Sequence, residues 1–350
     1  MKNISYKNID RIILFGGSRL AAVFASEIAK RKFCPLLVIS SKRHLKEIIN
    51  HEGETLEELL SAEKIPFYES RDVNTDKRLA GAITKETLGI ALGAAWVFSE
   101  KTARLFSPEY FLDFMGIDLP RYRGGAHYTW QILHQNRVGV ANLQIIKGGE
   151  KTFHKGDIIK RVEYRLPSKA GRPIDYFDFI LKEEMLFLSD FLKEIKERKP
   201  FPVMALNEEK RSYYPFLSSK ENGFINWSWS SRDIWLFISA FDEPYCGATT
   251  FIHGKRIFLK DCALLPAEEP YHPFTSGLII RKENNRLHVA AVGGILSIGT
   301  ILDEGAKNTF DIIKEGDRLY TPSEKIDGAM TFNAVYTSAG LKKSNKNKHE

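Results

Sequence analysis

The chain has 350 residues, of which 43% are hydrophobic and 27% charged, and this composition is typical of a soluble globular protein long enough for two domains. Its three cysteines, Cys34, Cys246 and Cys262, form no Cys-x-x-Cys pair and show no metal-ligand spacing, which argues against a disulfide scaffold and a zinc site. We therefore expect a reducing, cytoplasmic location and no metal. No apolar run is long enough to span a bilayer and no apolar leader is visible, so no membrane partner is expected.

The net charge of +7 is unevenly distributed along the chain. Residues 341–350 carry four lysines and one glutamate, which accounts for +3 of the total (4 − 1) and leaves +4 on the rest. The basic balance therefore gives little support for a nucleic-acid partner, although tRNA is not excluded. The polar composition of residues 336–350 predicts a disordered basic tail.

The N-terminal pattern predicts the opening of a doubly wound α/β domain. The apolar run Ile12–Phe15 ends in Gly16-Gly17-Ser18, and apolar residues then recur at helical spacing as far as Ile28. A nucleotide-dependent oxidoreductase is disfavoured, because the turn lacks the third glycine of the dinucleotide motif and no acid ends the next strand. A phosphate at the start of this helix remains possible.

Further strands and helices alternate through the first two hundred residues. Strands are predicted at residues 36–40, 65–68, 89–96, 111–115, 138–146 and 156–159, and helices at 55–62, 127–133 and 173–197. Residues 89–96 are mostly small, which leaves room for a ligand at the end of that strand. We expect Trp96 to belong to the hydrophobic core first and to form a wall of the ligand pocket second.

After a linker at Tyr213-Tyr214-Pro215 the pattern changes to short strands. A helix is predicted at residues 233–241, and strands at 224–227, 249–252, 256–259, 278–281, 287–292 and 295–298. Short strands separated by turn signals predict a small barrel. We thus expect an N-terminal domain over residues 1–205, a barrel domain over 206–335 and a tail over 336–350.

The segment Leu119-Pro-Arg-Tyr-Arg-Gly-Gly125 is the strongest candidate for ligand binding. Proline stiffens the loop, and two glycines permit positive φ or a close approach of the backbone to a ligand. Arg121 and Arg123 flank Tyr122, a combination that suits a flat, anionic ligand.

Leu119–Gly124 resembles the Leu-Pro-(Arg/Lys)-aromatic-Arg-Gly loop of the folate-dependent formyltransferases, a family that includes methionyl-tRNA formyltransferase and the sugar N-formyltransferases. Tyr213-Tyr-Pro and the Ile-Asn-Trp, Ala-Phe-x-x-Pro and Gly-Ala signals that follow resemble the family's C-terminal domain. The resemblance implies a Rossmann-like domain, an OB-like β-barrel and 10-formyltetrahydrofolate as the co-substrate of formyl transfer to an amine. It implies folate contacts for Trp96, Leu119, Arg121, Tyr122, Arg123, Gly124, Gly125 and Asp157, and an acceptor contact for His127.

The three catalytic positions of the family are all replaced. The family has Asn-x-His before the loop and an Asp downstream, where this chain has Asp113, Met115 and His154. The replacements remove the amide and the imidazole that stabilise an oxyanion. Two interpretations follow: a catalytically silent folate- or nucleotide-sugar-binding protein, or an enzyme with permuted roles. In the second, His154 is base or protonated donor and Asp113 orients it.

For the acceptor, we favour an amino-sugar nucleotide over methionyl-tRNA. Without the tail, the chain lacks the strong basic excess that tRNA phosphates require, and the Tyr-Tyr-Pro linker looks closer to the sugar enzymes. Assembly into an oligomer is possible.

Overall fold

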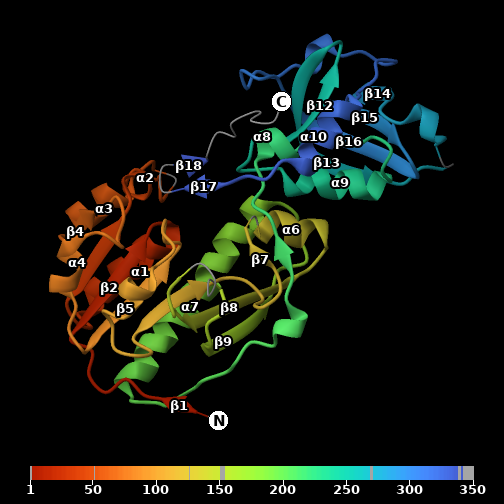
Figure 1. Ribbon diagram of the computed structural model, residues 1–350. Helices are drawn as coiled ribbons and strands as arrows, with labels where there is room; N and C mark the ends of the chain where they lie inside the picture. Colours follow the sequence, from red (N-terminus) through yellow and green to blue (C-terminus); the bar gives the residue numbers. More distant parts are fainter. Residues whose placement is uncertain are drawn as a thin grey trace, which may run out of the picture.

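The computed structural model describes residues 2–50, 52–125, 127–149, 154–268, 271–337 and 340–341. Two bodies are visible in Figure 1, one built on a seven-stranded sheet and the other on a five-stranded sheet. The predicted fold class, an α/β N-terminal domain followed by a smaller β domain, is confirmed.

The seven-stranded sheet has the order β4-β3-β2-β5-β6-β8-β9. Its parallel part contains β2 (Arg11–Gly16), β3 (Leu36–Ser40), β4 (Phe67–Glu69), β5 (Thr87–Leu92) and β6 (Phe111–Met115). The antiparallel edge contains β8 (Val138–Ile145) and β9 (Ile158–Arg165). The parallel strands are apolar along most of their length because helices cover both faces of this part of the sheet.

One face of the sheet is covered by α1 (Arg19–Arg31), α3 (Leu56–Ala62) and α7 (Pro173–Lys196), whose apolar sides share a core with Ile12 and Leu14. The other face packs against α4 (Lys77–Ala82) and α5 (Glu100–Ala103) through Ile13, Phe15 and Phe111. Ser18 caps the first helix, since its hydroxyl accepts a hydrogen bond from the Ala21 amide at 3.2 Å.

Smaller elements complete this half of the chain. They are β1 (Asn3–Ile4), which pairs with β10 (Phe201–Pro202), and α2 (Lys42–Leu45), α6 (His127–Leu133) and β7 (Arg123–Gly124). The predicted linker forms β11 (Tyr213–Tyr214), which pairs in parallel with β7 and so ties the connection to the candidate ligand loop.

The five-stranded sheet is antiparallel, in the order β12-β13-β16-β15-β14. Its strands are β12 (Ala248–Ile252), β13 (Lys255–Leu265), β14 (Ile279–Glu283), β15 (Arg286–Ala291) and β16 (Gly294–Leu302). Residues 317–320 hydrogen-bond to both edges: Phe251 and Tyr320 exchange backbone hydrogen bonds, and the Leu319 amide donates to Gly277. These bonds bring the two edges together, as in a barrel.

Helix α9 (Ser231–Ala240) fills one side of the barrel, and α8 (Ser219–Asn222) and α10 (Ser323–Thr331) lie close to each other. The barrel core continues into the first half of α7 through Tyr176 and Ile180, and into α6 through Ile132. The N-terminal sheet and the barrel are therefore joined by packed side chains as well as by the linker.

Some predicted elements differ from those observed. Residues 224–227 form no strand; Phe224 makes one bridge to Thr249 and a turn follows, because the Asn226 side chain accepts from the Ser228 amide. The predicted disordered tail, residues 336–350, falls mostly outside the described residues. Within it, β17 (Tyr336–Thr337) pairs with β18 (Gly340–Leu341).

Within the described part of the chain, none of the helices combines the length and the apolar character needed to cross a membrane.

Candidate active site

A cavity of about 640 Å³ lies at the carboxyl ends of β5 and β6, beside the turn that leads into α1. This edge is where open α/β sheets bind ligands. Seven of the predicted site residues line the cavity: Trp96, Asp113, Met115, Gly124, Gly125, His127 and His154. Leu119, Arg121, Tyr122, Arg123 and Asp157 lie outside its lining.

Asp113 occupies the middle of β6, between Ala91 of β5 and Gln144 of β8. Burial raises the pKa of its carboxyl to about 7. Among the described residues, no hydrogen bond or ion pair holds this carboxylate. A carboxyl with this pKa can bind or release a proton near neutral pH.

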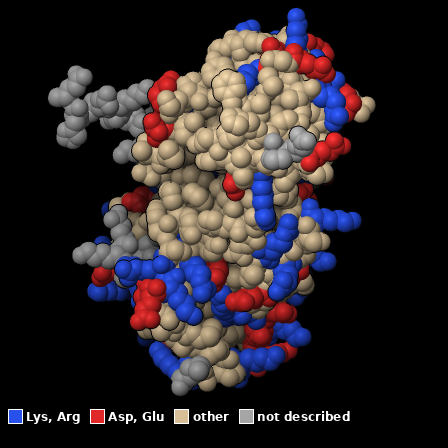
Figure 2. All heavy atoms as spheres, turned by 90° about the vertical axis from the view of Figure 1, so that its right-hand side faces the viewer, with Lys and Arg blue, Asp and Glu red and all other residues tan. Residues whose placement is uncertain are grey.

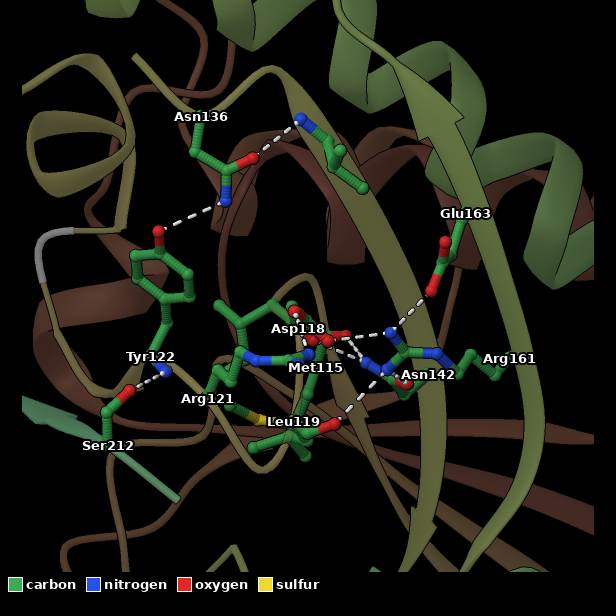
Figure 3. Close-up of polar contacts among 12 residues, drawn as sticks. Met115, Asp118, Leu119, Arg121, Tyr122, Asn136, Asn142, Arg161, Glu163 and Ser212 are labelled. Atoms are coloured by element: carbon green, nitrogen blue, oxygen red, sulfur yellow. Dashed lines mark hydrogen bonds and ion pairs between the residues drawn. The ribbon is translucent and has the colours of Figure 1, made fainter. Parts of the chain in front are cut away.

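Met115 lies between the cavity, which it lines, and a small apolar cluster, where it packs against Ile117, Leu119 and Ile158. Its carbonyl accepts a hydrogen bond from the Asn142 side chain at 3.1 Å, as Figure 3 shows. A thioether offers no proton, so the position of the family's histidine supplies only an apolar wall here.

His127 and His154 lie close enough to interact electrostatically. Burial lowers the pKa of His127 to about 4, and burial with the nearby His127 and Arg123 lowers the pKa of His154 to about 3. His154 is buried rather than exposed, and its φ of 56° lies in the left-handed region. The Nε2 atom of His127 is buried without a hydrogen-bond partner among the described residues. Both rings are therefore neutral at neutral pH, and each keeps one N–H donor and one acceptor nitrogen.

The arginines of the loop are engaged by protein groups. Arg123 is buried, forms two hydrogen bonds of 2.8 and 2.6 Å to the Glu208 carboxylate and donates from Nε to the His154 carbonyl oxygen at 3.1 Å. Arg121 pairs with Asp118 at 3.1 Å. Arg123 therefore connects the loop, the His154 segment and the linker, and a folate contact of either arginine stays a prediction.

A polar network behind the loop fixes its course (Figure 3). Arg161 on β9 donates to the carboxylates of Asp118 and Glu163, to the Asn142 side chain and to the Leu119 carbonyl oxygen. Leu119 itself is buried in a small apolar cluster.

The Tyr122 ring stacks on Tyr214 with 5.1 Å between centroids, and its hydroxyl accepts from Asn136. Gly124 has the predicted positive φ, at 112°. A Cβ built on Gly124 would overlap the Tyr214 carbonyl oxygen, and one on Gly125 would overlap the Phe216 ring. The absence of a side chain at Gly124 and Gly125 therefore lets residues 214–216 pack directly against the loop, and both glycines also border the cavity.

The two other predicted folate contacts have clear structural partners. Trp96 is buried in the core of one sheet face, lines the cavity and donates from Nε1 to the Arg71 carbonyl oxygen at 3.1 Å. Asp157 pairs with Lys147 at 3.2 Å.

Among the lining residues that sequence reasoning missed, Gln144 and Glu184 are buried and polar. Gln144 is buried beside Asp113 and donates to the Gly156 carbonyl oxygen at 2.8 Å. Glu184 is buried on α7, and burial raises its pKa to about 8. The signal for Glu184 was available, because a carboxylate interrupts the apolar stripe of Ile180, Leu188 and their neighbours.

The chain is similar in sequence and in fold to several known proteins. Residues 217–311 match the family described as formyl transferase, C-terminal domain. The methionyl-tRNA formyltransferase of Acetivibrio thermocellus is 28% identical over 200 residues, which cover 55% of this chain and 60% of that protein. The chain thus aligns with less than two thirds of the length of this curated relative.

Two solved structures share the fold. The N-formyltransferase from Helicobacter canadensis, in complex with folinic acid and dTDP-3-aminofucose, superposes with a TM-score of 0.60 at 16% identity, over 83% of this chain and 98% of that one. HypX from Aquifex aeolicus, in complex with tetrahydrofolic acid, superposes with a TM-score of 0.56 at 13% identity, over 93% of this chain and 48% of that one.

The fold thus combines a Rossmann-like sheet, which has a cavity at the carboxyl ends of its strands, with a smaller β-barrel. The chain resembles the folate-dependent formyltransferases in its N-terminal fold, its loop and its C-terminal domain.

Proposed function

We propose that the protein transfers a formyl group from 10-formyltetrahydrofolate to a primary amine. The observation that carries this proposal is the cavity itself, which gathers Asp113, His127 and His154 at the carboxyl ends of the parallel strands. Its volume of about 640 Å³ is within the range of small-molecule sites. Leu92, Trp96 and Phe98 offer apolar walls for a flat ring. Structural neighbours that hold folates, and the C-terminal domain match, support the same donor.

The reaction needs one base and donors for the formyl oxygen. The amine nitrogen bonds to the formyl carbon, the bond from that carbon to the folate nitrogen breaks, and one proton passes from the amine to the leaving nitrogen. Asp113 suits the proton transfer, because its carboxyl pKa is about 7. Neutral His127 and His154 each keep one N–H that can donate to the formyl oxygen.

For the acceptor we favour a nucleotide-linked amino sugar. A structural neighbour binds dTDP-3-aminofucose, and the face of the molecule in Figure 2 shows Lys and Arg interspersed with Asp and Glu around a broad uncharged area. A tRNA-binding surface requires concentrated positive charge. Methionyl-tRNA is the second candidate, supported by the curated relatives. A cytoplasmic location accords with three unpaired cysteines.

A catalytically silent folate- or nucleotide-sugar-binding protein is the alternative from another class. Asp113 and Met115 favour it, because neither supplies the uncharged donor that the family places there. In a silent protein, His154→Ala would have no transfer activity to remove.

The proposal is tested by incubating the protein with 10-formyltetrahydrofolate and, separately, dTDP-3-aminofucose or methionyl-tRNA, and by detecting the formylated product by mass spectrometry. We expect formylation of the sugar nucleotide and a loss of roughly 100-fold or more in His154→Ala. His253→Ala is the matched control, since this histidine is exposed in the turn between β12 and β13 and lies outside the cavity lining. Folate binding without transfer to either acceptor would favour the silent protein.

A further inference from the structure

The buried face of α7 carries one carboxylate at the point where the two cores meet. Tyr176 and Ile180 pack into the core that contains the barrel, whereas Phe187 and Leu188 pack into the core under the seven-stranded sheet. Glu184 lies between these pairs on the same face of the helix and is 7% exposed. An ionisable group in such a stripe is costly unless it is paired or functional.

The Glu184 carboxylate lacks a pairing partner in the part of the chain that the structure describes. Among the described residues, no hydrogen bond or ion pair reaches its carboxylate, whose pKa burial raises to about 8. Two titratable groups interact electrostatically with the Glu184 carboxylate, namely the Tyr128 hydroxyl from α6 and the Tyr164 hydroxyl from β9. The Tyr164 hydroxyl is itself buried without a described hydrogen-bond partner. A packing role alone does not account for a carboxylate at this position.

The carboxylate borders the reaction cavity beside the end of β6. A Cβ built on Gly116 would overlap Oε1 of Glu184, so the carboxylate rests against the backbone directly after Met115. Glu184 and Gly116 line the cavity, as do Asp113, His127 and His154. The other charged lining residues are Arg19, Glu47 and Lys147. A titratable group therefore lies next to the position where the family's histidine is replaced by methionine.

We propose that Glu184 is a catalytic residue of this cavity, which pairs with the ammonium form of the acceptor amine and removes its proton. This inference rests on the proposed function and specifies its substrate class as a primary ammonium. In the step, an N–H bond of the ammonium breaks, an O–H bond forms on the Glu184 carboxylate, and the freed electron pair on nitrogen is the one that attacks. Glu184 later releases this proton to solvent, so the net reaction consumes an ammonium and yields a formamide, tetrahydrofolate and one proton.

For Glu184 to accept a proton, the bound ammonium must first favour the ionised form of its carboxyl. The carboxyl is protonated at neutral pH in the absence of a cation, because burial penalises the charged form. A cation beside it reverses that preference. Binding of an ammonium is thus predicted to expel the carboxyl proton, which gives a readout that does not depend on folate or on turnover.

The test compares the wild-type protein, Glu184→Gln and Asp190→Asn, whose carboxylate is exposed farther along α7. Infrared difference spectra of wild type against Glu184→Gln at neutral pH should contain the C=O band of a protonated carboxyl. That band should disappear on addition of methylammonium chloride, and Asp190→Asn should behave as wild type. An ionised carboxylate at neutral pH, or a protonated band unchanged by saturating methylammonium, would overturn the proposal.

The kinetic arm separates this inference from the proposed function. If the protein formylates an amine, Glu184→Gln should lower kcat at neutral pH by roughly 100-fold or more, with an unchanged Kd for folinic acid. An unchanged kcat in Glu184→Gln would refute the catalytic role. Failure of the wild-type protein to bind folinic acid would instead refute the proposed function, and the methylammonium spectra would still decide whether Glu184 is a cation site.

Discussion

Replacement of Glu184 by glutamine should stabilise the protein, and by more as the pH rises. The carboxyl has an ordinary pKa near 4.5 and a folded-state pKa of about 8, so the folded protein binds this proton more tightly than the unfolded chain. Between these two values the folded state holds the additional proton, and stability falls as the pH increases. At 1.36 kcal/mol per pH unit, the cost is about 3 kcal/mol at pH 7 and about 5 kcal/mol above pH 8.

The assay is urea unfolding of wild type and Glu184→Gln at several values from about pH 5 to about pH 8. Asp113 weakens the fold with rising pH in the same way, whereas His127 and His154 act in the opposite direction because their pKa values are lowered. The difference between the free energies of unfolding of the two proteins cancels these shared contributions. A difference in the free energy of unfolding that stays constant with pH would refute the assigned burial of this carboxyl.

Three further outcomes are expected. Arg123→Ala should lower the free energy of unfolding by roughly 2–3 kcal/mol in urea titrations, because it removes the paired hydrogen bonds to Glu208 and the bond to the His154 carbonyl oxygen. Gly124→Ala should lower the melting temperature, since φ is 112° and a Cβ would overlap the Tyr214 carbonyl oxygen. In NMR titrations the His154 ring should stay neutral down to about pH 4, because its pKa is lowered to about 3.

Each of these outcomes has a control or a contrary result. Arg121→Ala, which loses a more exposed ion pair with Asp118, should change stability by less than about 1 kcal/mol. Gly53→Ala has positive φ but open space around it, so a smaller loss there than in Gly124→Ala would isolate the steric part. A His154 midpoint close to 6.5 would show that its ring is not desolvated.

The fold followed from the sequence wherever a local pattern matched its tertiary setting. The apolar run Ile12–Phe15 and the following glycines became β2 and the turn into α1, because helices cover both faces of the parallel strands. Residues 224–227 looked equally strand-like, but they make a single bridge, at Phe224, before a turn begins. There the Asn226 side chain bonds to the local backbone, an alternative that apolar alternation does not reveal.

The candidate site was only partly predictable. The chain order places Asp113 and Met115 at the end of a central strand, so their position in the cavity could be expected. The partner of Arg123 could not, because Glu208 is 85 residues away and arrives with the linker. Glu184 stands out in the sequence as a carboxylate within an apolar helical stripe, but its position against Gly116 is a contact between distant segments that no spacing encodes.

The most direct test of the central claim is calorimetric titration of the protein with folinic acid, a stable formyl folate, alongside Ala94→Trp. Ala94 lines the cavity at the end of β5, so a bulky ring there should occupy the space that the ligand needs. We predict saturable binding at one site in the wild-type protein and its loss in a folded Ala94→Trp variant. Absence of binding to the wild-type protein, or equal binding to both, would contradict the assignment of this cavity as the formyl-folate site.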